Sequence, residues 1–277
     1  MQQTSEPRLR ARTFTCMGTV ISLTVSADAH KAPQAAADEL EAATAVVERL
    51  FTELDSIFSL YRPDSEASRL VRGELALPEA SGEMRARYEE AAEWRLLTEG
   101  AFTPERPDGA LDLSGIVKGH AIREAGMSLL ALGMANWCLN AGGDVLVGGS
   151  PNPGTDVPWW AGIVDPADRR TLLAGFPLGG AAPCPPVGKT ADGGTRVALA
   201  TSGSAERGDH IWSVTAGTAE FRQVSVAAVD VVTADVLATA IVAGGVPMLN
   251  RATAMWDIEA LAVRANGELL ATGGFRR

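Results

Sequence analysis

Asp235 and Thr239, late in the chain, are a carboxylate and a hydroxyl that stand four residues apart. An apolar run over residues 224–232 precedes them and Gly244 follows, so we predict a buried strand and then a short helix with Thr233 as its N-cap. Residues four apart on a helix share a face, so the two oxygen-bearing side chains would point the same way. Such oxygen ligands suit Mg²⁺.

The same pair also has an ordinary structural explanation. A carboxylate in the first turns of a helix complements the helix dipole, and a threonine hydroxyl can bond back to the preceding turn. Because short patterns match by accident, these local roles explain the pair better when it is taken alone. The rest of the sequence has to decide between the two explanations.

A second group of chemically capable residues lies in the segment Leu-Asp-Leu-Ser-Gly-Ile-Val-Lys-Gly at 111–119. We expect Asp112 to end a short apolar strand, Gly115 to allow an unusual backbone turn, and Lys118 to open a helix over residues 119–132. An ammonium and backbone amides that meet at a helix start can hold a phosphate. The segment lacks the glycine spacing of a P-loop, and a strand, turn and helix with a solvated lysine is the alternative.

His210 follows a Ser/Gly-rich turn, Thr-Ser-Gly-Ser-Ala-Glu-Arg-Gly-Asp at 201–209. A histidine in that position could take a proton from a hydroxyl nucleophile. In isolation, capping or pairing at a hairpin explains it better. A serine hydrolase is disfavoured because the chain has no Gly-x-Ser-x-Gly elbow.

The elements that must position these residues divide the chain into a helical first half and a strand-rich second half. We predict helices at 35–60, 83–98, 119–132 and 233–244, and strands at 14–25, 137–140, 144–147, 159–165, 170–176, 197–201, 224–232, 257–264 and 268–272. Ala141, Gly142 and Gly143 would form a turn that lets backbones approach closely. This order predicts an α+β fold of mixed sheets with packed helices. We expect a single domain over residues 1–277, or two lobes in close contact.

The net charge of −10 argues against nucleic acid and anionic membrane surfaces as partners. A phosphate-ester substrate would therefore need a local reversal of charge by a metal, a lysine or backbone amides. Three scattered cysteines are too few for a zinc site or a disulfide framework.

Arginines at positions 8, 10 and 12 precede an apolar stretch and superficially resemble a signal peptide. The alternation of polar and apolar residues over 14–25 is instead typical of a strand. We expect no membrane-spanning segment, because no apolar run is long enough. The prediction is a cytoplasmic protein, although a mature exported protein would have the same features.

Eight segments in a fixed order share one resemblance. They are Met-Gly-Thr at 17–19, Phe-Ser-Leu-Tyr-Arg-Pro-Asp-Ser at 58–65, Gly-Ala-Phe-Thr-Pro at 100–104, Leu-Asp-Leu-Ser-Gly-Ile-Val-Lys-Gly at 111–119, Asn-Ala-Gly-Gly-Asp at 140–144, Ala-Thr-Ser-Gly at 200–203, His-Ile at 210–211, and Thr-Ala-Asp-Val-Leu-Ala-Thr-Ala at 233–240. Together they resemble the FAD:protein FMN transferases, the ApbE family, whose fold is T-fold-like. The resemblance spans nearly the whole chain.

The resemblance implies a role for each matching residue. Asp235 and Thr239 would be side-chain ligands of Mg²⁺, with the carbonyl of Gly115 as a main-chain ligand. His210 would be the catalytic base. The residues that would contact FAD are Met17, Tyr61, Ala101, Phe102, Thr103, Asp112, Lys118, Ala141, Gly142, Gly143, His210 and Ile211.

The implied reaction is Mg²⁺-dependent transfer of FMN from FAD to a Ser/Thr hydroxyl of a client protein, with release of AMP. Two departures stand out: Thr103 replaces the Asp that is usual in the family, and the segment after Ile211 lacks the usual Asp and Pro. These departures leave two alternatives, an FAD-binding or delivery protein with little transferase activity, and an FAD pyrophosphatase that yields FMN and AMP.

Overall fold

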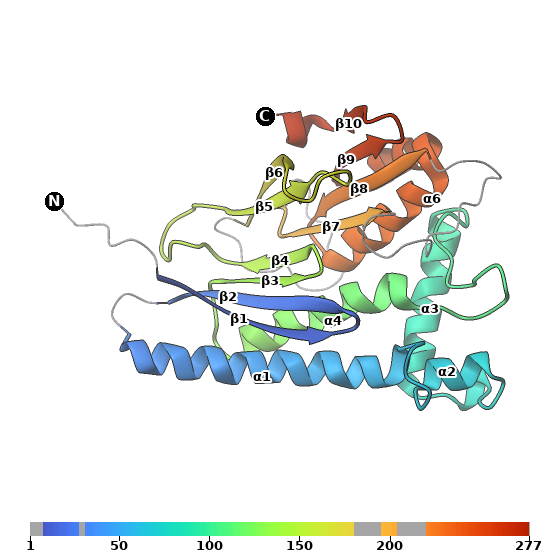
Figure 1. Ribbon diagram of the computed structural model, residues 1–277, viewed down its shortest axis with the longest axis horizontal. Coiled ribbons are helices and arrows are strands. Elements are labelled where there is room, and N and C mark those ends of the chain that lie inside the picture. The colour runs from blue at the N-terminus through green and yellow to red at the C-terminus, as the bar shows by residue number, and fades with distance from the viewer. Residues whose placement is uncertain (1–7, 28–30, 180–194, 204–219, 277) are drawn as a thin grey trace.

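A twisted eight-stranded sheet forms the centre of the fold, with the order β1-β2-β3-β4-β7-β8-β9-β10 (Figure 1). The computed structural model describes residues 8–27, 31–179, 195–203 and 220–276. Every strand pairing in it is antiparallel. The strands are β1 (Arg8–Cys16), β2 (Thr19–Ala27), β3 (Trp137–Ala141), β4 (Asp144–Gly148), β7 (Ala198–Gly203), β8 (Phe221–Ala228), β9 (Glu259–Arg264) and β10 (Leu269–Ala271). The predicted α+β fold is confirmed.

The first part of the chain forms a hairpin rather than the single strand predicted over 14–25. β1 and β2 pair from Arg8↔Ala27 to Cys16↔Thr19, and Met17 and Gly18 make the turn with φ of 49° and 69°. Positive φ at both central residues is what the two-residue I′ turn requires. The prediction was wrong because apolar residues continue through the turn and hide it.

The outer strand of this hairpin, β1, is one open edge of the sheet. Two of its arginines, Arg10 and Arg12, are bonded to the first helix, α1 (Pro33–Phe58). Arg12 pairs with Glu41 at 2.8 Å, and Arg10 donates to the Pro33 carbonyl at 2.8 Å. These arginines therefore belong to a folded strand.

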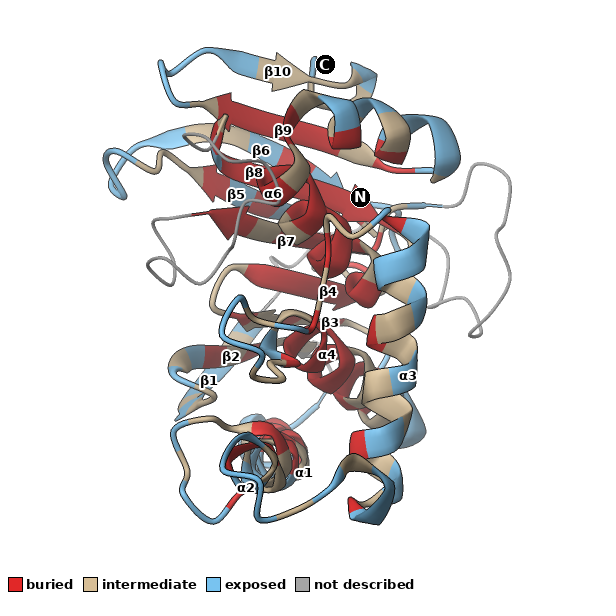
Figure 2. Cartoon of the chain, turned by 90° about the vertical axis from the view of Figure 1, so that its right-hand side faces the viewer, coloured by how far each residue is buried: buried red, intermediate tan, exposed pale blue. Residues whose placement is uncertain are grey.

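Three helices pack along one face of the sheet, each against a different group of strands (Figure 1). α1 covers β1 and β2, α4 (Ser114–Ala131) covers β3 and β4, and α6 (Val231–Met255) covers β7 and β8. Figure 2 shows that α4, α6 and the central strands are mostly buried, whereas α1 keeps an exposed side. The buried side of α1 carries the apolar residues that repeat at helical spacing, among them Leu40, Val47, Phe51 and Leu54.

Shorter elements close the two ends of this layer. α2 (Glu66–Val71) starts at Ser65, whose hydroxyl accepts the Ser68 N–H at 3.0 Å, and η1 (Leu77–Glu79) leads to α3 (Gly82–Leu97). At the other end, a two-stranded sheet of β5 (Trp159–Val164) and β6 (Leu172–Leu178) lies beside η2 (Gly273–Arg276). Gln223 of β8 ties β5 to the main sheet by donating to the Val164 carbonyl at 2.9 Å.

α6 is kinked where the sequence predicted its end. Gly245 has φ of 63° and ψ of −154°, and the Val246 N–H beyond it donates to the Glu220 carboxylate at 3.0 Å. By length and composition α6 could cross a membrane, which corrects the expectation that no segment is long enough. Its most apolar window is 72% buried inside the fold, however, so α6 forms part of the core.

A buried histidine joins α3 to α4. His120 Nδ1 lies 2.9 Å from Arg87 and 3.2 Å from Arg123, and its Nε2 lies 3.3 Å from Glu83. Burial first, and then the two guanidinium groups, lower the pKa of His120 from 6.5 to about 3. The ring is therefore neutral, and its Nδ1 accepts from the two arginines.

This arrangement predicts a specific loss of stability in acid. The pKa of His120 is lower in the folded state than in the unfolded state, so stability is lost as the pH falls below 6.5. We expect the free energy of unfolding to drop by about 2 kcal/mol between about pH 6.5 and 4.5 on account of His120. Urea unfolding at several pH values measures this change in the free energy of unfolding.

His120→Gln is the matched control, because an amide can accept from the arginines without titrating. Its stability should depend less steeply on pH over the same interval. Identical slopes for the two proteins would contradict the assignment.

Candidate functional site

α6 begins three residues earlier than the sequence indicated. Its N-cap is Asp230, whose carboxylate accepts the Thr233 N–H at 2.9 Å and the Thr233 hydroxyl at 3.1 Å. The predicted cap at Thr233 was wrong because Val231 and Val232, which read as the end of a strand, form the first turn of the helix. Asp235 consequently lies in the second turn.

Asp235 and Thr239 lie on the side of α6 that faces the interior. Asp235 is only 3% exposed. The Thr239 hydroxyl is 3.0 Å from the Ser202 hydroxyl of β7, which places it toward the sheet. The shared face predicted from the four-residue spacing is therefore directed into the fold, where a carboxylate and two hydroxyls come from adjoining elements.

Lys118 is buried beside this pair rather than solvated at a helix start. α4 begins at Ser114, five residues before the predicted helix, so Lys118 lies in its second turn and is 8% exposed. Its ammonium contacts Asp144 directly and lies 4.0 Å from Asp235 Oδ1. The alternative of a solvated lysine is excluded by this burial.

Gly119 allows α4 and α6 to approach closely enough for these contacts. A Cβ at Gly119 would lie 3.1 Å from the Val232 Cα and 3.4 Å from the Asp235 side chain. A larger residue would push against the backbone of α6 just before Asp235. The absence of a side chain at Gly119 therefore positions the Asp235 carboxylate against Lys118.

Gly115 lies at the start of α4 and not in an unusual turn, which corrects the expectation for this residue. A Cβ there would be 3.1 Å from the ring of Phe102, which is buried over it. Ala101, which precedes Phe102, packs against Gly244 of α6. A Cβ on Gly244 would be 3.1 Å from the Cβ of Ala101. The segment 101–102 thus bridges the start of α4 and the kink of α6.

Two other predicted residues make local hydrogen bonds near this bridge. Thr103 accepts the Glu105 N–H at 3.2 Å through its hydroxyl. Asp112 accepts the Ser114 N–H at 2.9 Å and so orders the first turn of α4. Both stand in the connection that leads into α4.

The turns that carry Met17 and residues 141–143 pack against each other. Gly142 and Gly143 have φ of 62° and 97°, and a Cβ at Gly142 would come within 2.4 Å of the Thr19 hydroxyl. The N–H groups of both glycines are already bonded, to the Val20 carbonyl at 3.1 Å and to the Asn140 side chain at 2.9 Å. These amides are therefore committed to structure, and a ligand here would meet the glycines by close packing.

Tyr61 is separate from the buried group within the described part of the chain. It lies on the loop after α1, where the residue is 86% exposed and its backbone N–H donates to the Ser59 hydroxyl at 3.3 Å. His210 and Ile211 lie outside the described residues. Ser202, which bonds to Thr239, stands near the end of β7, two residues before that segment begins.

The structure adds two residues to which the sequence analysis gave no role in the site. Asp144 is 0% exposed, contacts Lys118 through Oδ2, and accepts the Thr201 N–H at 3.0 Å through Oδ1. Ser202 contributes its hydroxyl beside Thr239. Asp144 closes the Asn-Ala-Gly-Gly-Asp motif, which was a usable signal, whereas nothing local in the sequence links Ser202 to Thr239, 37 residues away.

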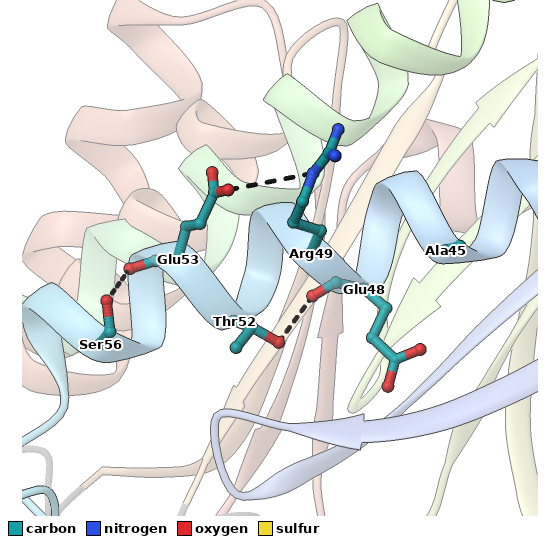
Figure 3. Close-up of a pocket in the computed structure, with 6 residues that line it drawn as sticks. All are labelled: Ala45, Glu48, Arg49, Thr52, Glu53 and Ser56. Carbon is teal, nitrogen blue, oxygen red and sulfur yellow. Dashed lines mark hydrogen bonds and ion pairs between the residues drawn. The ribbon is translucent and has the colours of Figure 1, made fainter.

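A depression on the exposed side of α1 is unrelated to this group (Figure 3). Its polar groups are satisfied within the helix: the Thr52 hydroxyl donates to the Glu48 carbonyl at 2.8 Å, and the Ser56 hydroxyl donates to the Glu53 carbonyl at 2.6 Å. A single helix face with internal hydrogen bonds offers little to hold a ligand. Its lining residues are Ala45, Glu48, Arg49, Thr52, Glu53 and Ser56.

Comparisons with known proteins identify the family of this chain. The sequence model of the ApbE family matches residues 17–106 and 103–262, which include every predicted site residue from Met17 to Thr239. The chain belongs to the ApbE family. None of the curated protein sequences compared with this ApbE-family chain is significantly similar to it.

Solved structures of ApbE proteins share the fold over nearly the full length of both chains. Flavin transferase ApbE from Vibrio cholerae has a TM-score of 0.72 at 22% identity, covering 98% of this chain and 99% of that one. The ApbE protein from Thermotoga maritima has a TM-score of 0.72 at 19% identity, covering 96% and 97%. The apo form of flavinyl transferase ApbE from Pseudomonas stutzeri has a TM-score of 0.71 at 17% identity, covering 99% and 98%.

The approach of α4 to α6 predicts an unusual effect of a Gly-to-Ala change. Alanine inside a helix is normally favoured over glycine by about 1 kcal/mol. At Gly119 we expect Ala to destabilise instead, by about 1–3 kcal/mol, because the added methyl meets the backbone of α6. Thermal and urea unfolding measure the change.

Gly82→Ala is the matched control, since Gly82 is also helical and a Cβ there would have no neighbour within 4 Å. That variant should be as stable as the parent or slightly more so. A Gly119→Ala protein that gained stability would disprove the close contact.

Proposed function

We propose that this chain is a Mg²⁺-dependent FAD:protein FMN transferase that moves FMN from FAD to a Ser/Thr hydroxyl of a client protein. Membership of the ApbE family supports the proposal. So does the approach of Lys118 on α4 to within 4.0 Å of Asp235 on α6, where the two helices meet at Gly119. FAD and the client are the partners that this function requires, and we keep the prediction of a cytoplasmic location as part of the proposal.

The observation that carries the proposal is the buried carboxylate of Asp235, one helical turn before Thr239, whose hydroxyl lies 3.0 Å from the hydroxyl of Ser202. Among the described residues, no three His, Cys, Asp or Glu side chains come together as a metal-binding group. The donor set is therefore one carboxylate with hydroxyl and carbonyl oxygens, which fits a hard cation that keeps part of its water shell. Asp235, Thr239 and the Gly115 carbonyl would hold Mg²⁺, which would act there as a Lewis acid and template for the diphosphate of FAD.

The other residues would bind and orient FAD, and His210 would move a proton. The turns at Met17 and at residues 141–143 would contact the cofactor through closely packed backbone, and the exposed side chain of Tyr61 would stack on its ring. His210 would take the proton of the client hydroxyl as its oxygen bonds to the FMN phosphorus. The bond from that phosphorus to the AMP oxygen breaks, and AMP leaves.

One sequence feature favours a second candidate, an FAD-binding or delivery protein with little transferase activity. The residues after Ile211 are Trp-Ser-Val-Thr-Ala-Gly, without the Asp and Pro that are usual in the family. A pyrophosphatase would use the same metal site with water in place of the client hydroxyl. The three activities differ in their products and can be separated in one assay.

Incubation of the purified chain with FAD, MgCl₂ and a Ser/Thr acceptor peptide tests the proposal. We expect covalent flavin fluorescence on the peptide and equimolar AMP. FMN and AMP without a labelled peptide would indicate hydrolysis, and unchanged FAD would indicate binding alone; either result contradicts the transferase assignment. Asp235→Asn, which keeps the shape of the side chain, should lose at least about 99% of the turnover, because it removes the charged ligand.

Asp38→Asn is a suitable control for that variant. It also removes one negative charge, but from an exposed position on α1 where the carboxylate accepts only from Gln34 within the described residues. It should keep the parental rate. An Asp235→Asn protein with the parental rate would remove Asp235 from the metal site.

The assignment of His210 as the base gives a separate prediction. We expect His210→Ala to lower the transfer rate by about 100-fold or more, as loss of a general base does, while FAD affinity stays within about twofold. Single-turnover kinetics and FAD titration measure the two quantities. An equal loss of rate and affinity would instead make His210 a binding residue.

A further inference from the structure

Three charged side chains lie together where α4, α6 and β4 meet. Lys118, Asp144 and Asp235 are 8%, 0% and 3% exposed. The two carboxylates are not equivalent, because the ammonium contacts Asp144 Oδ2 directly and lies 4.0 Å from Asp235 Oδ1. Lys118 therefore pairs with Asp144 on the sheet and makes no direct contact with Asp235 on α6.

The position of Asp144 is set by two strands, and it determines the position of the Lys118 ammonium. It is the first residue of β4, directly after the glycine turn, and it pairs with Ala141 across the hairpin. Its second oxygen accepts the Thr201 N–H of β7 at 3.0 Å. Two strands thus determine where this carboxylate stands, and the ammonium of Lys118 follows it.

The distance matters because a lysine and a metal ion compete for the same carboxylate. An ammonium in full contact with Asp235 would oppose a divalent cation there, and in a buried site that opposition is weakly screened. We propose that Asp144 is a positioning residue that draws Lys118 away from Asp235 and so preserves the affinity of Asp235 for a divalent cation. The inference rests on the proposed function, since it presumes the cation site at Asp235.

This role differs from the one that the resemblance implies for Lys118. If Lys118 holds a phosphate of FAD, its replacement would weaken the binding of FAD by the protein, and the loss would not depend on Asp144. If Asp144 instead restrains Lys118, replacing either residue would change the affinity for Mg²⁺. The two changes would have opposite signs and would cancel when both residues are replaced. A double-variant comparison separates the two roles.

Titration calorimetry of the full chain with MgCl₂ tests the inference in three variants. We expect Asp144→Asn to bind Mg²⁺ about tenfold more weakly, because the released ammonium pairs with Asp235. Lys118→Met should bind Mg²⁺ about tenfold more tightly, and the double variant should return to within about threefold of the parent. Asp38→Asn controls for the change in net charge, and circular dichroism verifies folding.

Each result decides the question. A parent chain that binds no Mg²⁺ would end both the proposed cation site and this inference. A parent chain that binds Mg²⁺, with Asp144→Asn equal to it, would overturn the inference alone, as would a double variant no better than Asp144→Asn. If Asp144→Asn does not fold, Lys118→Met still tests the inference. Unchanged or weaker Mg²⁺ binding by Lys118→Met would contradict competition between Lys118 and Mg²⁺ for Asp235.

Discussion

The close contact of α4 with α6 at Gly119 is the constraint on which the rest of this site depends. It brings the second turns of two helices together, so that Lys118 and Asp235 approach although they are far apart in the sequence. The sheet beneath supplies the remaining partners, since β4 presents Asp144 and β7 presents Ser202 to the same space. A wider spacing of the two helices would separate Lys118 from Asp235.

The polar groups of this region are buried at a cost that their mutual contacts offset. Burying a charge without partners is expensive, and burying an ion pair is acceptable only when further hydrogen bonds complete it. Asp144 meets that requirement through Lys118 and the Thr201 N–H, and the Thr201 hydroxyl continues the chain of contacts to Ser225 at 2.8 Å. In a protein with a net charge of −10, this network holds one buried positive charge against Asp144, 4.0 Å from the carboxylate that the proposed function uses.

Periodic elements could be predicted from the sequence, and their junctions could not. α1 and α3 lie within two residues of the predicted helices because their apolar spacing and their breakers are strong local signals. The kink of α6 falls at Gly245, where glycine and proline end the helical pattern. The starts of α4 and α6 were misplaced because glycine at 115 and valine at 231 and 232 suggest other structures locally, while tertiary packing favours helix.

The site was predictable to the extent that its residues lie in ordered motifs. Asp235, Thr239, Gly115 and Lys118 were identified in this way, and the structure brings Lys118 to within 4.0 Å of Asp235. What the sequence could not show is the pairing of Lys118 with Asp144, because a cross-element ion pair leaves no spacing to detect. It also could not show that the glycine N–H groups of the 141–143 turn are already bonded.

The open ends of the eight-stranded sheet have a consequence for the behaviour of the protein at high concentration. An edge strand exposes backbone groups that can pair with a second molecule, and natural sheets guard such edges with charge or by keeping them short. β10 has only three residues, and β1 carries arginines at alternate positions, of which Arg10 and Arg12 are tied to α1. The arginines that imitate an export signal in the sequence thus protect the chain against edge-to-edge aggregation.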